Sequence, residues 1–313
     1  MDILLIIGGL ALLFAGGEVL IRGAVAIATA LGLSTLLVST VIVGFGTSTP
    51  ELVVSVNSAL VDSPAIALGN VVGSNIANVL LILGISAIVM PICCKNKSIL
   101  RDSVIVLMIS LALAILSLFL PLNLFVGVSM IALLAAYIGF CIWNESRNNQ
   151  NHEIEVAKGS ASFSSIGKNL AICGTGLALL IFGARFLLDG AVSLATNFGI
   201  SEAVIGLTIV AVGTSLPELI TAIIASFRKQ SDVVIGNILG SNLFNILGIL
   251  GVTGIISTIP FDGRIAEYDI WIMTMIAALT IPIIWTGHKI SRIEGAVFVA
   301  LYIAYTVWLF WQG

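Results

Sequence analysis

Long apolar stretches separated by short polar breaks run through the whole chain. A membrane-spanning helix needs about 20 predominantly apolar residues. The polar breaks leave ten stretches of that kind, at residues 3–29, 35–61, 65–92, 100–119, 122–143, 166–196, 202–227, 232–258, 267–286 and 292–312. This pattern predicts an all-α integral membrane protein with ten transmembrane helices.

The composition supports the membrane assignment. Of the 313 residues, 59% are hydrophobic and 9% are charged, and the mean hydropathy is +1.17. A water-soluble protein of this length needs far more polar surface, so that class is excluded. Asp2 is acidic and no basic residue precedes the first apolar run, which favours a retained first helix over a cleaved secretion signal.

One segment is polar enough to lie in water. It is "NESRNNQNHEIEVAKGSASFSS", residues 144–165, and it is short and lacks hydrophobic periodicity. We expect a linker here that joins two five-helix halves, residues 1–143 and 166–313.

Lysine and arginine gather in the turns on one side of the predicted bundle. The turns after the third, fifth, seventh and ninth helices contain ten of the 13 basic residues. Basic loops stay on the cytoplasmic side of a membrane. We therefore expect both termini outside and the linker in the cytoplasm. The ten residues are Lys95, Lys97, Arg101, Arg147, Lys158, Lys168, Arg228, Lys229, Lys289 and Arg292.

The two halves are copies of each other. "GFGTSTPELVVS", from Gly44, recurs as "AVGTSLPELITA" from Ala211, and 211 minus 44 is 167. The same offset aligns "GNVVGSNIANVLLILG", from Gly69, with "GNILGSNLFNILGILG" from Gly236, and it also aligns the first helix with the sixth. Each half has five spans, an odd number, so the second half enters the membrane from the opposite side. The sequence thus predicts two inverted five-helix repeats, an arrangement in which transporters bind their substrate between the repeats.

The GTSxPE element carries chemistry that an apolar helix does not need. A proline inside a helix deprives the preceding carbonyls of their partners, and the threonine and serine hydroxyls add oxygen atoms beside them. Glu51 and Glu218 add charge, and each carboxylate costs about 3 kcal/mol at the membrane centre. One divalent cation, two monovalent cations or two protons would neutralise this pair. All the donors are oxygens, which suits a hard ion such as Ca²⁺ and argues against zinc, copper or nickel.

The second repeated element, GSNxxN, adds four polar side chains. Ser74 and Asn78 lie four residues apart, as do Ser241 and Asn245, so each pair shares one helix face. These faces meet the glutamates if the second, third, seventh and eighth helices pack together. Small residues spaced by four allow such close packing; they are Gly69, Gly73, Gly236 and Gly240.

Other polar positions have simpler interpretations. Glu18 with Arg22, and Arg185 with Asp189, are spaced four apart on one helix, and we expect each pair to neutralise itself. The four cysteines form no metal-binding pattern, and we expect them to be reduced packing residues. They are Cys93, Cys94, Cys141 and Cys173.

The paired motifs resemble the two alpha-repeats of the calcium/cation antiporter superfamily, and within it the prokaryotic type of sodium/calcium exchanger. The resemblance spans nearly the whole chain. It implies a calcium extruder in the inner membrane of a prokaryote, driven by inward sodium, in which helices 1 and 6 slide past the other eight to alternate access. It also implies a set of ion ligands: Glu51, Glu218, Thr47, Ser48, Thr214, Ser215, Ser74, Asn78, Ser241 and Asn245, with the carbonyls of Gly44 and Ala211.

The sequence identifies the ion that drives transport less directly than it identifies the ion ligands. Some relatives that also transport potassium carry aspartate where this chain has Asn245, so potassium co-transport is not expected. The proton-coupled branch usually lacks the Thr-Ser-x-Pro run, which favours sodium. Proton-coupled exchange of calcium or another divalent cation remains the alternative, because coupled glutamates can also trade protons.

Two further classes of function were considered. A cation channel could use the same oxygen ligands, but inverted repeats with paired carboxylates fit an occluding site better. A serine hydrolase needs a base near its serine, and the two histidines, His152 and His288, lie in predicted cytoplasmic loops, so no enzyme is expected. The expected partners are Ca²⁺, Na⁺, protons in the alternative, and the lipid bilayer. We expect no cofactor and no nucleic acid, and one copy of the chain is enough to build the site.

Overall fold

A computed structural model describes residues 2–61, 64–151, 163–198 and 213–312. Within these ranges eight helices are long and apolar enough to cross a membrane, or nine if the bent pair Thr35–Thr47 and Thr49–Leu60 is one span. Half of the predicted linker, the first part of the predicted seventh helix and Ala211 lie outside the described residues. The described chain is therefore helical and multi-spanning, as predicted.

The first half runs from α1 to α8. Its helices are α1 (Asp2–Leu31), α2 (Thr35–Val38), η1 (Ser39–Gly44), α3 (Phe45–Thr47), α4 (Thr49–Leu60), α5 (Pro64–Ala77), η2 (Asn78–Leu83), α6 (Gly84–Val89), α7 (Lys97–Leu116) and α8 (Leu124–Asn151). A two-residue strand, β1 (Ile92–Cys93), precedes α7.

The second half begins with α9 (Phe163–Asn197) and continues through the same kinds of element. The others are α12 (Leu216–Phe227), α13 (Ser231–Leu243), η4 (Phe244–Ile249), α14 (Leu250–Ile256), η5 (Ile265–Asp269), α15 (Ile270–Gly287), β2 (Lys289–Ile290) and α16 (Arg292–Gln312). Applying the 167-residue offset to α5–η2–α6 gives α13–η4–α14. The repeat in sequence is therefore also a repeat of secondary-structure elements.

The central helices contain π-helical turns that the hydrophobic pattern did not predict. They are η2 in the first half and η4 in the second, together with η1 before the GTSTPE motif. A π-helical turn inserts one extra residue and changes which side chains share a face, and it is often found at functional sites. Asn78 begins η2, and Asn245 is the second residue of η4.

The second predicted span is not one helix kinked at its proline. It breaks at Ser48, whose φ of −80° and ψ of 11° leave the helical range, and the helix resumes at Thr49 with a 46° bend. Pro50 therefore occupies the first turn of α4, where a missing N–H costs nothing. The same break recurs at Ser215 before α12.

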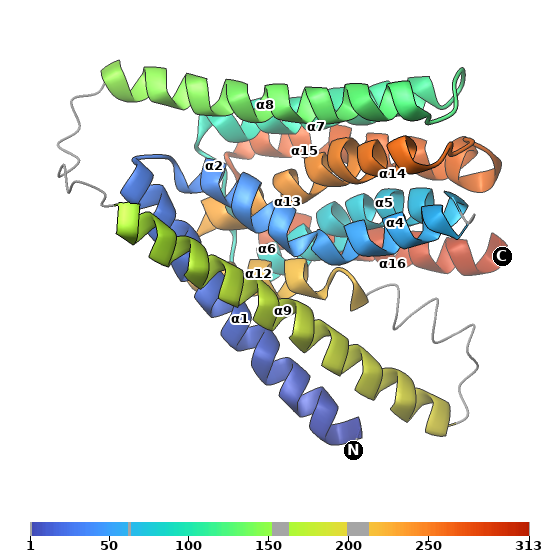
Figure 1. Cartoon of the computed structure of the whole chain (residues 1–313), viewed down its shortest axis with the longest axis horizontal. Coiled ribbons are helices and arrows are strands. Elements are labelled where there is room, and N and C mark those ends of the chain that lie inside the picture. Colours follow the sequence, from blue (N-terminus) through green and yellow to red (C-terminus); the bar gives the residue numbers. More distant parts are fainter. Residues whose placement is uncertain (1, 62–63, 152–162, 199–212, 313) are drawn as a thin grey trace.

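Helices α1 and α9 lie side by side along their whole length and cross the other helices obliquely (Figure 1). They run antiparallel and touch through glycines spaced by seven residues. A Cβ on Gly16 would lie 2.8 Å from the carbonyl oxygen of Gly176, and one on Gly9 would lie 2.8 Å from that of Gly183. Because no side chain fits between the two backbones, α1 and α9 form one tightly packed pair.

The helices that contain the repeated motifs occupy the centre of the bundle. α13, η4 and α14 are buried almost throughout, and so are most residues of α5, η2 and α6, whereas α8 and α16 are mostly exposed. α8 packs on α14, and α16 packs on α6, pairings that the 167-residue offset interconverts. Exposed side chains on the outer helices are large and apolar, such as Phe125 and Trp143, as expected of a surface that faces lipid.

Short backbone pairings tie the loops together at both ends of α7. β1 and β2 pair antiparallel, with Ile92 opposite Ile290, before α7 begins. After α7, Leu122 and Ile259 form an isolated bridge. Ile92 and Ile259 differ by 167, so the two pairings are also related by the repeat.

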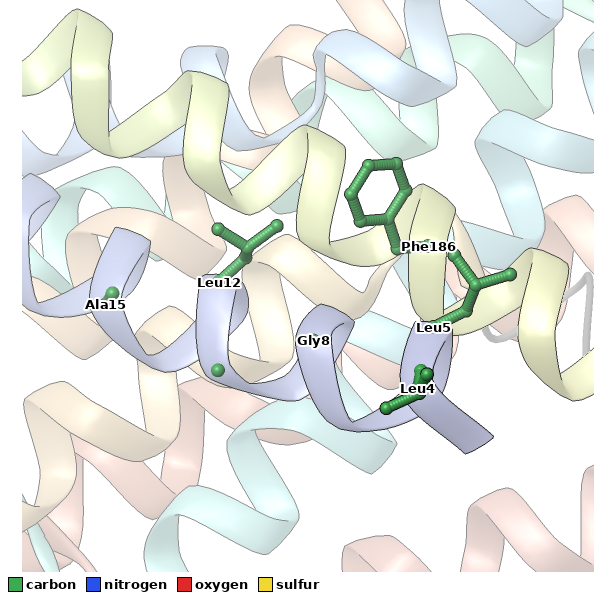
Figure 2. A pocket seen from close by; sticks show the side chains of 7 residues that line it. Leu4, Leu5, Gly8, Leu12, Ala15 and Phe186 are labelled. Carbon is green, nitrogen blue, oxygen red and sulfur yellow. The ribbon is translucent and has the colours of Figure 1, made fainter. Parts of the chain in front are cut away.

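The outer face of the α1–α9 pair carries a shallow groove of about 610 Å³ (Figure 2). Its lining is entirely apolar, with Leu12 of α1 and Phe186 of α9 among the side chains. A groove without charged or polar side chains cannot hold an ion, so the ion site must be sought elsewhere.

Candidate functional site

The two motif glutamates lie in the first turn of a helix, one in each half. Glu51 follows the break at Ser48, and Glu218 follows the break at Ser215. Each residue is only 1% exposed. A helix N-terminus favours negative charge because its free N–H groups point outward. The breaks therefore give each buried carboxylate a partly favourable setting.

A serine of each motif binds the glutamate of the other. Ser48 Oγ donates to Glu218 Oε1 at 2.9 Å, and Ser215 Oγ donates to Glu51 Oε1 at 3.1 Å. The two motifs, 167 residues apart in sequence, therefore meet face to face.

Two asparagines that the sequence analysis did not select hold the backbone beside the glutamates. Asn70 Nδ2 donates to the carbonyl oxygen of Glu51 at 3.0 Å, and Asn237 Nδ2 donates to that of Glu218 at 3.2 Å. Both belong to the Gly-Asn pair that opens the second repeated motif. That repetition was the available signal, whereas the four-residue spacing selected only the later serine and asparagine.

The predicted asparagines of the second motif are buried at the same centre. Asn78 and Asn245 are each 1% exposed. Each amide nitrogen donates to an asparagine of the other half, whereas neither Oδ1 has a hydrogen-bond partner among the described residues. Each amide therefore presents a free oxygen.

The remaining predicted residues surround this centre in different ways. Ser241 Oγ donates to the carbonyl oxygen of Gly44 at 3.0 Å, whereas Ser74 Oγ donates to that of Asn70 at 2.6 Å within its own helix. Thr47 Oγ1 lies 3.1 Å from Asn237 Oδ1. Thr214 is half-buried, and Ala211 lies outside the described residues. The hydroxyls of the two halves are therefore not used identically.

Pro50 removes a helical donor from a preceding carbonyl, as expected, but a hydroxyl rather than an ion compensates for it. The carbonyl oxygen of Gly44 accepts hydrogen bonds from Ser241, from Thr47 and from the backbone N–H of Ser48. That of Gly46 accepts from Thr49 Oγ1 at 2.7 Å. The Gly44 carbonyl keeps its helical donor, the N–H of Ser48, and only the Gly46 carbonyl has a hydroxyl in place of a missing N–H, so both carbonyls are already satisfied.

Nine buried side-chain oxygens of the described residues lack partners, and four of them belong to the repeated glutamate and asparagine motifs. Buried acceptors without a donor are rare because each loses its hydration without compensation. The four motif oxygens form two pairs related by the 167-residue offset, one of carboxylate oxygens and one of amide oxygens. These four atoms are Glu51 Oε2, Glu218 Oε2, Asn78 Oδ1 and Asn245 Oδ1.

The donor set at this centre is composed of oxygen. Among the described residues no group of three or more histidine, cysteine, aspartate or glutamate side chains is placed to hold a metal. Two carboxylates with amide and hydroxyl oxygens suit a hard cation such as Ca²⁺ or Na⁺. A soft transition metal would find none of the sulfur or imidazole ligands that it prefers.

A cavity of about 350 Å³ adjoins residues that flank the two glutamates, although neither glutamate lines it. It lies between α4 and α9 and is lined by residues of both glutamate motifs, among them Pro50 and Thr214. Ala184 and Arg185 of α9 also line it. The equivalent interface, between α1 and α12, is filled instead: a Cβ on Gly17 would lie 2.6 Å from Ile224 Cδ1.

One of the two predicted intrahelical ion pairs forms. Glu18 Oε1 accepts from Arg22 Nε at 2.7 Å and is also paired with Arg228, at the end of α12. In the part of the chain that the structure describes, Arg185 forms no ion pair with Asp189. Arg185 lines the cavity instead, so the expectation of a self-neutralising pair on α9 is wrong.

The cysteines are free, as expected, but they are not all packing residues. Cys94, Cys141 and Cys173 are buried, whereas Cys93 is exposed. The backbone N–H of Cys93 donates to Ser231 Oγ at 2.9 Å. Cys93 therefore lies at the loops, where a hydrogen bond links β1 to the first residue of α13.

The chain belongs to the sodium/calcium exchanger protein family, whose sequence model matches residues 1–143 and 168–311. It is 34% identical over 316 residues to CaxA of Alkalimonas amylolytica, a candidate antiporter by name, with 96% of each chain covered. It is 28% identical over 345 residues to the sodium/calcium exchanger MaX1 of Methanosarcina acetivorans, with 99% of each covered.

A solved structure shares the fold. The sodium-calcium exchanger NCX_Mj, soaked with Na⁺ and Sr²⁺, superposes with a TM-score of 0.85 at 30% identity, covering 98% of this chain and 97% of that one. Members of this family are transporters that exchange cations across membranes, not enzymes. The expectation of a multi-spanning cation antiporter is confirmed.

Proposed function

We propose that this member of the sodium/calcium exchanger family exchanges Ca²⁺ for Na⁺ at the central site between Glu51 and Glu218. The observation that carries the proposal is the set of four unpartnered buried oxygens, two from these carboxylates and two from Asn78 and Asn245. Uncompensated acceptors at the centre of a membrane protein are costly. A bound cation would satisfy all four at once.

The charge of the site accounts for exchange. Two carboxylates are neutralised by one divalent cation or by two monovalent cations, and leaving them unneutralised inside the membrane is costly. Ca²⁺ and Na⁺ would therefore compete for the same oxygens. Binding of one would require departure of the other, which is the basis of antiport.

Access to the site is proposed to alternate between the two sides of the membrane. The cavity between α4 and α9 would admit ions from one side. The filled interface between α1 and α12 would block the other side. A continuous pore would need both to be open, so this asymmetry favours an exchanger over a channel.

We also propose that the halves are inverted repeats. The offset makes α1 and α9 equivalent, and these helices run antiparallel. The loops that contain most of the lysines and arginines gather at one end of α7, where β1 pairs with β2 and Cys94 N–H donates to the His288 carbonyl oxygen at 2.8 Å. By the charge rule this end is cytoplasmic, both termini are outside, and the cavity opens outward.

The test of function is ion flux in proteoliposomes that contain the purified protein. An imposed Na⁺ gradient should drive uptake of labelled Ca²⁺ against its own gradient, and an imposed proton gradient of equal size should not. Uptake driven by protons alone would support the proton-coupled alternative. Large unitary currents in bilayer recordings would instead indicate a channel.

The orientation can be tested with the protein's own cysteines. Cys93 is exposed, and a membrane-impermeant maleimide should label it in inside-out vesicles but not in intact cells. Cys94 is an internal control because burial raises the pKa of its thiol to about 12, which leaves little reactive thiolate. Labelling in intact cells, lost in Cys93→Ser, would reverse the proposed orientation.

A further inference from the structure

Four buried asparagines connect the two halves beside the proposed ion site. Asn78 Nδ2 donates to Asn242 Oδ1 at 3.0 Å, and Asn245 Nδ2 donates to Asn75 Oδ1 at 3.0 Å. The offset of 167 converts each hydrogen bond into the other. The later asparagine of each motif is therefore held by the earlier asparagine of the opposite half.

These hydrogen bonds decide which end of each amide is free. An asparagine amide has a donor end and an acceptor end of nearly the same shape. Anchoring the nitrogen of Asn78 and of Asn245 leaves each Oδ1 without a partner. Without the anchor, the amide could rotate and present its NH₂ group, which repels a cation.

Asn75 is itself firmly held. Its Nδ2 donates to the backbone carbonyl oxygen of Asn242 at 3.3 Å and lies 3.6 Å from Met273 Sδ. Its Oδ1 can therefore only face Asn245. Asn75 and Asn242 are 2% and 3% exposed, so water does not compete for these bonds.

We propose that Asn75 and Asn242 are positioning residues that turn the amide oxygens of Asn245 and Asn78 toward the cation and so raise the preference for Ca²⁺ over Na⁺. The inference rests on the proposed exchange function. Attraction between an ion and an oxygen dipole scales with the ion's charge. Loss of an oriented oxygen should therefore weaken Ca²⁺ binding more than Na⁺ binding.

The first test uses single variants in the sodium-driven flux assay. Asn242→Leu and Asn75→Leu preserve volume but remove the acceptor. Each should raise the KM for Ca²⁺ about 10-fold, with a smaller change in the KM for Na⁺, as expected for loss of one charge-assisted contact. Equal changes for both ions would contradict a role in selectivity.

The second test exploits the crossed pattern. In an Asn78→Ala background, Asn242→Leu should change the KM for Ca²⁺ by less than about 2-fold, because its only target is gone. In an Asn245→Ala background, the same substitution should retain most of its 10-fold effect. Asn75→Leu should show the reverse pattern. Additive effects in all four doubles, or coupling within one half, would overturn the inference.

A conservative variant separates positioning from folding. Asn242→Asp keeps an oxygen acceptor for Asn78, so it should retain a KM for Ca²⁺ no higher than that of the original protein. If Asn242→Asp lost affinity as Asn242→Leu does, the inference would fail. If the unmodified protein showed no Na⁺-driven Ca²⁺ flux, the proposed function would fail first, which distinguishes the two outcomes.

Discussion

The interface of α1 with α12 and the interface of α9 with α4 occupy equivalent positions in the 167-residue repeat, yet one is filled and the other is hollow. On the α1–α12 side, Gly17 faces Ile224 and Glu18 is paired with Arg228. On the α4–α9 side, the equivalent residues Ala184 and Arg185 line the 350 Å³ cavity.

The centre between these two interfaces is more nearly symmetric, although Ser74 and Ser241 bond differently. The crosswise serine bonds, the asparagine bonds to the glutamate carbonyls and the unpartnered oxygens all occur in matched pairs. The duplication therefore conserves most of this hydrogen-bond pattern in both halves. The interfaces differ because a cavity lies between α9 and α4, whereas α1 packs closely against α12.

The largest expected effect comes from breaking the matched centre. Glu51→Gln and Glu218→Gln each keep the side-chain shape but remove one of the two negative charges that balance the bound cation. Each should reduce Na⁺-driven Ca²⁺ flux at least about 100-fold, because no third carboxylate of the described residues joins the pair to replace it. Purified variants with unchanged thermal unfolding temperatures would exclude misfolding. Normal flux in either variant would show that the two halves do not contribute equally.

A smaller effect is expected from the α1–α9 contact. Gly16→Ala would place a Cβ 2.7 Å from the backbone nitrogen of Leu180 and should destabilise the protein by about 1–3 kcal/mol. Gly8→Ala, on the same helix, is the matched control, since a Cβ there has nothing within 4 Å. Thermal unfolding in detergent should separate the two variants. Equal unfolding temperatures would indicate that the two helices are not packed backbone to backbone.

The smallest effect is expected at the charged edge of the filled interface. The pair of Glu18 and Arg228 is partly exposed, so its loss should cost at most about 1 kcal/mol. A cysteine introduced into α12 by Leu216→Cys, in a background with Cys93→Ser, can report access from the cytoplasmic side through its rate of maleimide labelling. Arg228→Ala should raise that rate by up to about 5-fold.

Two further variants control this measurement. Arg228→Lys keeps the charge and should restore the original labelling rate. Arg22→Ala removes the other partner of Glu18 but leaves the link to α12, so it should change the rate little. If Arg22→Ala and Arg228→Ala accelerated labelling equally, the contact between α1 and α12 would not depend on this ion pair.

Much of the fold could be predicted because the signals are local. The eighth span was expected at 232–258 and is found at Ser231–Ile256, since its length and apolar character mark its ends. The π-helical turn at Asn78 was not predictable, because a single extra residue leaves the hydrophobic pattern nearly unchanged. The break at Ser48 was not predicted for a related reason, since a proline fits either a kink or a first turn.

The candidate site was predicted in part. Glu51 and Glu218 could be selected because a duplicated carboxylate in an apolar helix needs compensation. Asn75 and Asn242 were passed over because the four-residue spacing relates side chains on one helix only. Their partners lie in the opposite half, at a distance of 164 or more residues along the chain.

The sequence by itself determined the membrane-spanning character, the duplication and the oxygen chemistry of the centre, because each depends on local composition or on an offset that can be read directly. Only the tertiary structure decided which serine binds which glutamate, which amide oxygens are left free and which of the two equivalent interfaces contains a cavity. Those outcomes depend on packing between helices far apart in sequence. Such packing is the sum of many weak contacts that no local sequence pattern records.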